Sequence, residues 1–320
     1  MSDVHRHGQD ENRGSSRALA QHGVRLRERL IAELPRLGPI AARLAPISNA
    51  VAGLPALKRA AGISAARRLP RFQAPYSGQG AGDVLLFADT FNRYFEPETL
   101  HAAARVIGQG GVRVGVAHDP GRPLCCGRTY LSAGMTDRAL AEMRRTTQVL
   151  RAALDRGQKI VGLEPSCTLM FRDEVPNLLS DWTPQMGAQI LTFAEYMAAH
   201  PPQGLRLDGP ALVHGHCHQK AMGVAQATVA VLNALDGCEA EMIDSSCCGM
   251  AGPFGYQAET EAVSRRMAEL ALAPAVRAAP AGARVVADGF SCRCQISDVA
   301  GRKAQSLAQT LDQALEARAC

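Results

Sequence analysis

Aromatic residues are scarce in this chain. They make up only 4% of its 320 residues, although 47% of the residues are hydrophobic. The core must therefore be filled by Ala, Val and Leu, which suits helices packed on a parallel sheet better than a β-sandwich. A chain of this length can bury one large core or two ordinary ones. The composition thus favours an α/β fold.

Long apolar runs are absent as well. No stretch reaches the roughly 18 uncharged apolar residues that a membrane-spanning helix needs, and the first ten residues are too polar for a secretory signal. We therefore expect a cytoplasmic protein whose thiols stay reduced. In that setting ten cysteines, which include two Cys-Cys pairs, indicate metal or redox chemistry rather than structural disulfides.

Charge is unevenly distributed along the chain. Residues 1–80 contain thirteen Lys and Arg but only five Asp and Glu, whereas the net charge of the whole chain is +5. Residues 1–20 are polar and are predicted to be a disordered tail. Residues 21–82 are predicted to be a basic helical arm that ends in a linker from residue 63, and its short helices are not expected to be stable alone. The prolines that interrupt this arm are Pro35, Pro39, Pro46 and Pro55.

The rest of the chain is an internal repeat, with residues 83–205 and 206–320 as its two copies. Each copy has a short apolar strand, a Cys-Cys-Gly unit, a helical pattern, a second apolar strand and a single cysteine. These lie at 83–87, 125–127, 137–154, 159–163 and Cys167 in the first repeat, and at 211–213, 247–249, 258–272, 284–287 and Cys292 in the second. Strands that alternate with helices predict two pseudo-symmetric βα repeats, with parallel sheets covered by helices and preceded by the helical arm.

Four cysteines of the second repeat form the best candidate site. In open α/β sheets ligands bind beyond the carboxyl ends of the strands, and a helix N-terminus favours a thiolate. Cys292 follows a predicted strand in this way, and Cys217 adds a further thiol to Cys247 and Cys248. Four thiolates are what a [4Fe–4S] cluster requires, so we predict that these four residues hold one. The glycine after each Cys-Cys pair would let the cluster approach closely.

The first repeat offers a poorer set of ligands. Cys125, Cys126 and Cys167 form the second candidate site, but Thr90 stands where Cys217 stands in the second repeat. Thr is a weak cluster ligand. This site is therefore incomplete, uses another ligand, or has become structural.

Two other interpretations of the cysteines remain open. Buried cysteines can act as small apolar residues, which applies more to the first set, because duplicated Cys-Cys-Gly units rarely arise from packing needs. Zinc is the other alternative, but zinc sites usually show Cys-x-x-Cys spacing, and no such pair occurs here. Cys294 is predicted to point away from the site, and Cys238 and Cys320 match nothing in the repeat.

Histidines and acids surround the candidate ligands. On a strand His214, His216 and His218 would share one side, opposite Cys217, unless the strand has already ended. A histidine could donate a hydrogen bond to a cluster sulfur or replace a ligand as in Rieske-type centres, and we favour a hydrogen-bonding or structural role. Acids near the same strand ends are expected to set local charge, be solvated or cap helices. These acids are Asp89, Glu164 and Asp288.

The combined motifs point to a known family. They are Cys-Cys-Gly twice, Glu-Pro-Ser-Cys (164–167), His-Gly-His-Cys-His (214–218), Cys-Cys-Gly-Met-Ala-Gly (247–252) and Asp-Gly-Phe-Ser-Cys (288–292). With these motifs the chain resembles the cysteine-rich CCG domain family, which includes the iron–sulfur subunit of glycolate oxidase and the B subunit of heterodisulfide reductase. It looks most like the C-terminal region of FAD-linked glycolate/D-lactate oxidases, which also carry Asp-Thr-Phe (89–91) and Tyr-Phe-Glu-Pro-Glu (94–98).

The chain departs from this family pattern in two ways. Fused relatives carry an FAD domain and a ferredoxin-like cysteine module upstream, whereas no cysteine precedes Cys125 here. The chain therefore looks like the last third of such an enzyme standing alone. Heterodisulfide reductase relatives close each repeat with Cys-x-x-Cys, but Met170 and Gln295 occupy the closing positions here.

The resemblance implies an iron–sulfur electron-transfer subunit of an FAD-linked 2-hydroxy-acid oxidoreductase. Electrons would pass from FAD, bound only on a partner dehydrogenase subunit, through a 4Fe-4S cluster to a quinone or another carrier. The basic arm would dock on that partner or on an anionic membrane surface, so the protein is expected in the cytoplasm or on the inner face of the membrane. No nucleic-acid partner is expected.

Two alternative functions stay open at this point. One is a heterodisulfide-reductase-like enzyme that acts on thiols and disulfides, although the missing closing cysteines count against it. The other is a truncated, non-catalytic remnant of an FAD-linked oxidase. Whether the chain is itself an enzyme is not decided by its sequence.

Overall fold

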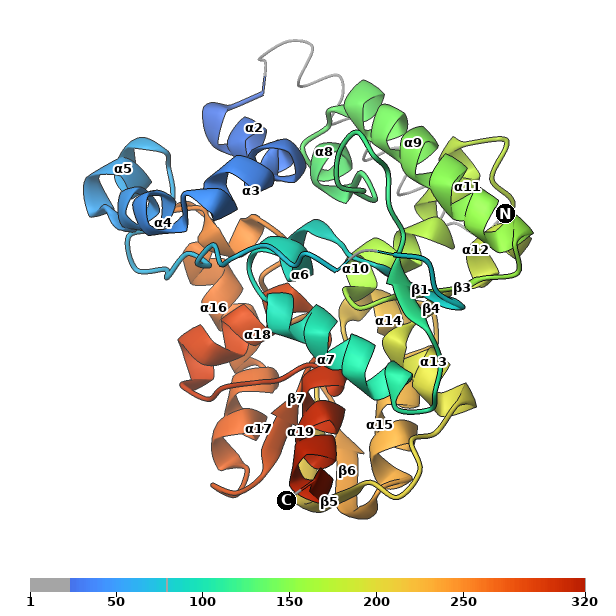
Figure 1. Ribbon diagram of the computed structural model, residues 1–320. Helices are drawn as coiled ribbons and strands as arrows, with labels where there is room; N and C mark the ends of the chain where they lie inside the picture. Colours follow the sequence, from blue (N-terminus) through green and yellow to red (C-terminus); the bar gives the residue numbers. More distant parts are fainter. Residues whose placement is uncertain (1–23, 79, 320) are drawn as a thin grey trace.

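Four short parallel strands form the first sheet, in the order β2-β1-β3-β4. The computed structural model describes residues 24–78 and 80–319 (Figure 1). Alternate residues of β1 enter two different apolar clusters, because both faces of the sheet are covered. The strands are β1 (Val84–Phe87), β2 (Val114–Val116), β3 (Lys159–Gly162) and β4 (Ile190–Thr192).

Three parallel strands form the second sheet, in the order β6-β5-β7. They are β5 (Arg206–Val213), β6 (Asp236–Met242) and β7 (Arg284–Val286). β2, β4 and β6 were not predicted from the sequence. β6 is an edge strand in which Cys238 is the one fully buried side chain, so it lacks the apolar run that marks the central strands. The predicted α/β class with parallel sheets surrounded by helices is confirmed.

The helices of the first repeat follow its strands. They are α6 (Thr90–Tyr94), α7 (Pro97–Gly108), α8 (Arg128–Ser132), α9 (Thr136–Asp155), α10 (Pro165–Thr168), η1 (Leu169–Phe171), α11 (Glu174–Leu178), α12 (Pro184–Ala188) and α13 (Phe193–Ala199). The long helix predicted for 137–154 is confirmed as α9, whose apolar side packs on the sheet through Met143 and Leu150.

The helices of the second repeat include a break that the sequence analysis missed. They are α14 (Cys217–Ala221), α15 (Gln226–Asn233), η2 (Phe254–Tyr256), α16 (Glu261–Glu269), α17 (Leu272–Ala278), α18 (Phe290–Gln295), η3 (Ile296–Ala300) and α19 (Leu307–Ala319). The helix predicted for 258–272 is confirmed as α16, but it is shorter than predicted and ends at Glu269. Pro274 cannot donate to the carbonyl of Leu270 and its ring would clash there, so the helix ends and a new one begins at Leu272.

The two repeats share one apolar core. α19, at the end of the described chain, packs along α7 of the first repeat (Figure 1). Leu86 and Leu100 from the first repeat lie in the same buried cluster as Val213 and Leu311 from the second. The repeats are therefore held together by their own hydrophobic contacts.

Four short helices of the arm precede the first sheet. They are α2 (Leu26–Ala32), α3 (Leu34–Arg43), α4 (Ala45–Gly53) and α5 (Pro55–Ala60). Pro35, Pro46 and Pro55 lie in the first turns of α3, α4 and α5, where a missing N–H costs nothing. Pro39 lies inside α3 and does not end it, contrary to the prediction. α2 packs on α8 and α3 on α6, so these helices are supported by the first repeat.

Within residues 24–78 and 80–319, no helix combines the length and the apolar character that crossing a bilayer requires.

Candidate metal centre

The order of the second sheet brings three strand ends together. β5 lies between β6 and β7, and all three run in the same direction. Cys217 opens α14 after β5, and Cys292 lies in α18 after β7. Cys247 and Cys248 follow β6. Because parallel strands end at one edge of a sheet, the four predicted ligands approach each other there.

The thiols lie close enough at this edge to shift the pKa of one another. The interacting pairs are Cys217 with Cys247, Cys247 with Cys248, and Cys248 with Cys292. Cys248 and Cys292 are buried, Cys247 is half-buried and Cys217 is exposed. The structure therefore brings together all four cysteines of the best candidate set. Their role as metal ligands remains a prediction.

Two of the four thiols, Cys247 and Cys292, have a pKa below the ordinary value, in both cases first through the neighbouring thiols. His214 and His216 lower the pKa of Cys292 further, against the effect of burial. The pKa of Cys248 is raised, first by its hydrogen bonds with the neighbouring thiols and then by burial. A cation at this edge would favour loss of these remaining protons, as metal binding to thiols requires.

His214 is buried against two of these sulfurs. β5 ends at Val213, so the strand alternation that would place the three histidines opposite Cys217 does not apply. The His214 Nδ1 atom lies 3.0 Å from Ser245 Oγ. A ring nitrogen of His214 and the sulfurs of Cys248 and Cys292 lie within 4.8 Å of one another. The Nε2 atom of His214 is buried and has no hydrogen-bond partner in the described part of the chain.

The other two histidines have different surroundings. His216 caps α14, where its Nδ1 accepts the backbone N–H of His218 at 3.2 Å. Burial lowers the pKa of His216. His218 turns to the first repeat, with its Nε2 3.1 Å from Asp173 and its Nδ1 3.4 Å from the guanidinium of Arg128.

The Cys-Cys-Gly loops need glycine because a helix lies directly behind them. Gly127 and Gly249 have φ values of 87° and 90°. A Cβ atom on Gly249 would lie 2.3 Å from the carbonyl of Ser264 in α16, and one on Gly127 would lie 2.9 Å from that of Ala139 in α9. The crowding that glycine relieves in this structure therefore comes from the next helix.

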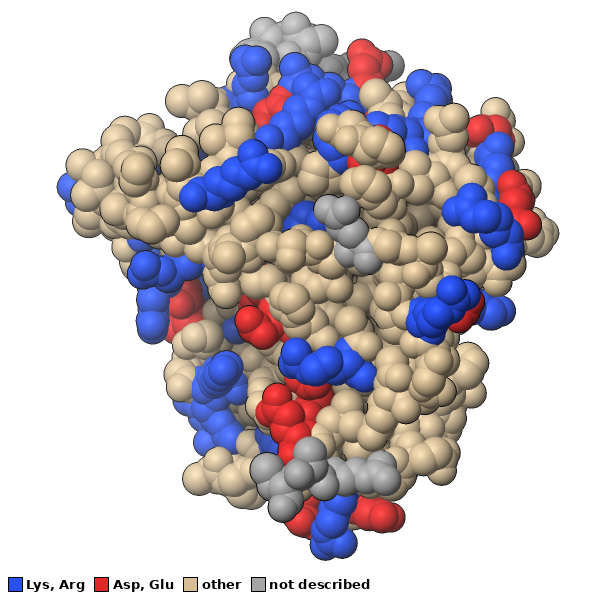
Figure 2. All heavy atoms as spheres, viewed as in Figure 1, with Lys and Arg blue, Asp and Glu red and all other residues tan. Residues whose placement is uncertain are grey.

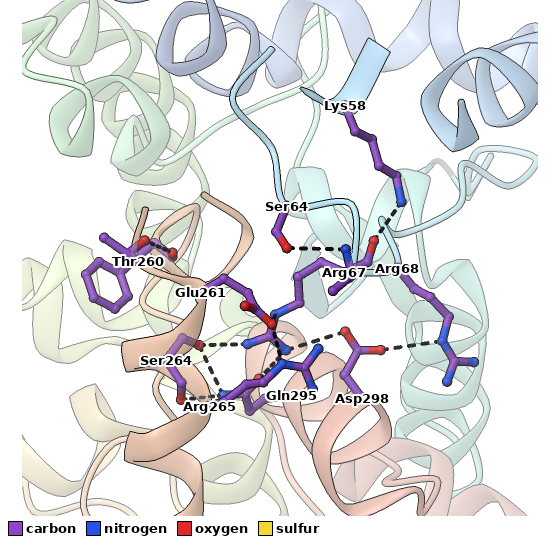
Figure 3. A network of polar contacts seen from close by, with 12 residues as sticks. Lys58, Ser64, Arg67, Arg68, Thr260, Glu261, Ser264, Arg265, Gln295 and Asp298 are labelled. Atoms are coloured by element: carbon purple, nitrogen blue, oxygen red, sulfur yellow. Dashed lines mark hydrogen bonds and ion pairs between the residues drawn. The ribbon is translucent and has the colours of Figure 1, made fainter. Parts of the chain in front are cut away.

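A buried arginine from the arm supports the second loop (Figure 3). The guanidinium of Arg67 donates to Gln295 Oε1 at 2.7 Å and to Ser264 Oγ at 2.9 Å, and lies 3.4 Å from Asp298. Gln295 Nε2 donates in turn to the carbonyl of Cys248 at 2.8 Å. The segment that looked like a linker in the sequence thus reaches the cysteine loop. Gln295 holds that loop from the position where heterodisulfide reductase relatives have a cysteine.

The three cysteines of the first repeat also meet. Cys126 lies close enough to Cys125 and Cys167 to shift the pKa of both thiols, and all three are buried. Thr90 opens α6 as Cys217 opens α14, and offers no fourth thiol. A hydrogen bond with Cys126 lowers the pKa of Cys167, but burial and two nearby carboxylates raise it to about 12 overall. This site suits a metal less well than the second one.

The three acids near the strand ends are buried, so the expectation that they are solvated is wrong. Asp89 caps α6 by accepting the N–H groups of Phe91 and Asn92, and Glu164 caps α10, as expected for capping residues. Glu164 also accepts the N–H of Phe290 at 2.7 Å, which ties the first cysteine site to α18 of the second. Asp288 accepts the N–H of Leu307 at 2.9 Å.

The remaining cysteines lie apart from both sets. Cys238 is buried in the apolar core beside α15. Cys294 is half-buried and packs against the cluster that contains Tyr94, Phe95 and Phe290. Cys320 lies outside the described residues.

The repeated α/β fold and its paired cysteine loops define a duplicated cysteine-rich domain. Residues 87–172 and 211–297 each match the family called CCG, which is described as a cysteine-rich domain. These matches cover more than half of the chain, and the chain therefore belongs to the CCG cysteine-rich domain family. The family predicted from the motifs is confirmed.

Curated relatives place this likeness among oxidoreductase components. The C subunit of anaerobic glycerol-3-phosphate dehydrogenase from Escherichia coli (strain K12) is 25% identical over 294 residues, 85% of this chain and 72% of the relative. D-2-hydroxyglutarate dehydrogenase of the same strain is 26% identical over 78% of this chain, which spans only 24% of that enzyme. Lactate utilization protein A of Macrococcus caseolyticus (strain JCSC5402) is 24% identical over 54% of this chain and 73% of the relative.

The glycine in the second loop can be tested with a matched pair. We expect Gly249→Ala to lower the free energy of unfolding by the ~1–2 kcal/mol that a left-handed alanine costs, and by a further amount because its Cβ clashes with the carbonyl of Ser264. Gly252 has a φ of 62° and open space where a Cβ would lie, so Gly252→Ala should lose only the free energy that the left-handed backbone costs an alanine. Urea unfolding and the reaction rate of the buried thiols measure both effects. Equal losses in the two variants, with unchanged thiol reactivity, would show that the helix contact is unimportant.

Asp89 should make the stability of the metal-free chain depend on pH. Burial and the charge of Glu164 raise its pKa from 3.8 to about 6. The folded state holds this proton more tightly than the unfolded chain does, so protonated Asp89 adds about 3 kcal/mol to the free energy of unfolding. This stabilisation is fully present below pH 4 and is lost as the pH rises through 6. The difference in unfolding free energy between wild type and Asp89→Asn should fall by that amount between pH 4 and 7. A constant difference would contradict the assignment.

Proposed function

We propose that this chain is the iron–sulfur electron-transfer component of an FAD-linked oxidoreductase of the 2-hydroxy-acid type. It would take electrons from FAD on a partner dehydrogenase subunit and pass them to a quinone or another carrier. One observation carries the proposal: four thiols from three separate strand ends meet at one edge of the second sheet. The likeness to a dehydrogenase and to a dehydrogenase subunit supports it.

The residues at this edge fit an iron–sulfur cluster. Cys217, Cys247, Cys248 and Cys292 supply the four thiolates that a [4Fe–4S] cluster takes from a protein. The unpartnered nitrogen of His214 beside them is a buried polar atom that lacks a partner within the described chain. When bound, such a cluster accepts and releases single electrons.

The residues at this site have different roles. Buried Cys248 and Cys292 keep one side of the site dry, while exposed Cys217 leaves the other side open to the surface. Electron transfer needs a short route to its partners, and the face around Cys217 would provide it. Gln295 and Arg67 hold the Cys248 loop in place from behind. The same contacts occupy the position of a closing cysteine, which argues against thiol–disulfide chemistry at this site.

The ligand assignment is tested with two cysteine variants. After anaerobic purification we expect about four irons and four sulfides per chain, and an electron paramagnetic resonance signal on reduction. Cys248→Ser should lose most of the iron and of the signal, whereas Cys238→Ser, in the apolar core, should keep both. Loss of iron from both variants alike, or a wild-type protein that binds zinc alone, would refute the assignment.

The arm has the surface of a peripheral membrane contact. Nine exposed Leu, Ile and Val side chains lie between residues 26 and 57. Basic side chains gather over α2, α3 and α8 (Figure 2), α4 contains no charged residue, and α5 carries Lys58 and Arg59 in its last turn. Exposed apolar side chains beside basic ones suit the interface of an anionic lipid bilayer. We therefore propose that this arm places the protein on the inner face of the membrane, near a quinone acceptor.

Vesicle binding tests this placement. The wild-type protein should sediment with vesicles of phosphatidylcholine and phosphatidylglycerol, and less with phosphatidylcholine alone, since each Lys or Arg near an anionic surface contributes ~1 kcal/mol. Ile40→Glu with Ile47→Glu should abolish this binding, whereas Leu270→Glu, on an exposed side chain of the second repeat, should not. Unchanged binding in the double variant would contradict the proposal. The proposal would also be contradicted if the double variant lost a co-purifying flavoprotein but still bound vesicles, because the arm would then bind a protein partner.

A further inference from the structure

A small cavity lies at the carboxyl ends of β1 and β2. Its volume is about 220 Å³, which is below the ~300–1,000 Å³ typical of sites for drug-sized ligands. Its walls include the loop 117–124, which follows β2, and Arg93 in α6, which follows β1. Ligands of open α/β sheets bind beyond the carboxyl ends of the strands. The cavity therefore lies where this fold can hold a small molecule, and the described residues that line it include no candidate metal ligand.

Arg93 brings a positive charge to this cavity without an acidic partner among the described residues. Its Nε donates to the carbonyl of Ala88 at 3.4 Å and its Nη1 to that of Tyr76 at 3.2 Å. Nη2 has no hydrogen-bond partner in the described chain. Asp89 directly precedes α6, but its carboxylate caps that helix. Burial lowers the pKa of Arg93, and an anion in the cavity would offset that cost.

The other charged side chains that line the cavity are already balanced. Asp119 accepts a hydrogen bond from Arg145 at 2.6 Å, and Arg122 forms an ion pair with the buried Glu142. Two acids and two arginines thus compensate one another. The charge that remains at the cavity is the single positive charge of Arg93.

We propose that this cavity binds a small monocarboxylate. One carboxylate would balance the charge of Arg93, with Nη2 donating to one of its oxygens. Ala117 and Leu124 also line the cavity, so a short carbon chain would find apolar contacts there. A phosphate group would bring more than one negative charge and no carbon chain. Because this binding requires no metal, a chain without iron still carries the site.

Calorimetric titration of the purified chain with three probes tests the proposal. Sodium butyrate should bind at a single site. Butyramide has a similar shape but no charge, so it should bind at least about tenfold more weakly, because hydrogen bonds to charged groups are stronger than neutral ones. Inorganic phosphate should also bind more weakly than butyrate. The proposal is overturned if butyrate shows no saturable binding, or if butyramide or phosphate binds as tightly as butyrate.

A matched pair of variants locates the site. Arg93→Lys keeps the charge but loses the guanidinium fork, so it should weaken butyrate binding about tenfold. Arg113→Lys is the control and should leave binding unchanged, because Arg113 is exposed, pairs with Asp83 and does not line the cavity. Unchanged binding in Arg93→Lys, or an equal loss in both variants, would overturn the proposal.

If Arg93→Lys does not fold, the wild type decides. Phenylglyoxal modifies accessible arginines, and mass spectrometry measures the modification of each one. Butyrate should slow the modification of Arg93 and leave that of Arg113 unchanged. The proposal is overturned if Arg93 reacts equally fast with and without butyrate, or if it does not react at all, since the cavity would then be closed to solutes.

Discussion

The parallel order of three strands is the constraint on which the second site depends. β5 lies between β6 and β7, so the segments that follow the three strands meet at one edge of the sheet. The four cysteines are far apart in the sequence, and only Cys247 and Cys248 are held together by the local chain. The site therefore exists only when the sheet is formed. The arm adds to this support, because Arg67 donates to Gln295 (Figure 3), and Gln295 in turn donates to the carbonyl of Cys248.

The two repeats share a fold but differ in the charges that surround their thiols. In the first repeat buried Asp89 and Glu164 lie near Cys167 and oppose its ionisation. In the second repeat histidines lie near Cys292 and favour its thiolate. Negative charge beside a thiol disfavours the form that binds metal, whereas a hydrogen-bond donor favours it. Duplication thus gave two similar scaffolds, and the neighbouring side chains distinguish them.

Much of this arrangement could be predicted from the sequence, because it is repeated there. The central strands, α9 and both cysteine sets follow from apolar runs and from the duplicated Cys-Cys-Gly units. The edge strand β6 could not be predicted, because most of its side chains are exposed or half-buried and it has no apolar run. The helix break before Leu272 was missed although Pro274 marks it. The roles of Arg67 and Gln295 could not be foreseen, because they depend on contacts between residues 228 and 47 positions apart. The sequence places His214 near the site, but its position against the sulfurs of Cys248 and Cys292 follows only from the fold.

The central claim is that iron is held at the edge of the second sheet by side chains from three strand ends. Diffraction from anaerobically grown crystals, measured on both sides of the iron absorption edge, tests it most directly. The account predicts anomalous peaks among Cys217, Cys247, Cys248 and Cys292. Iron at another place in the chain, or no iron signal at this edge, would contradict it.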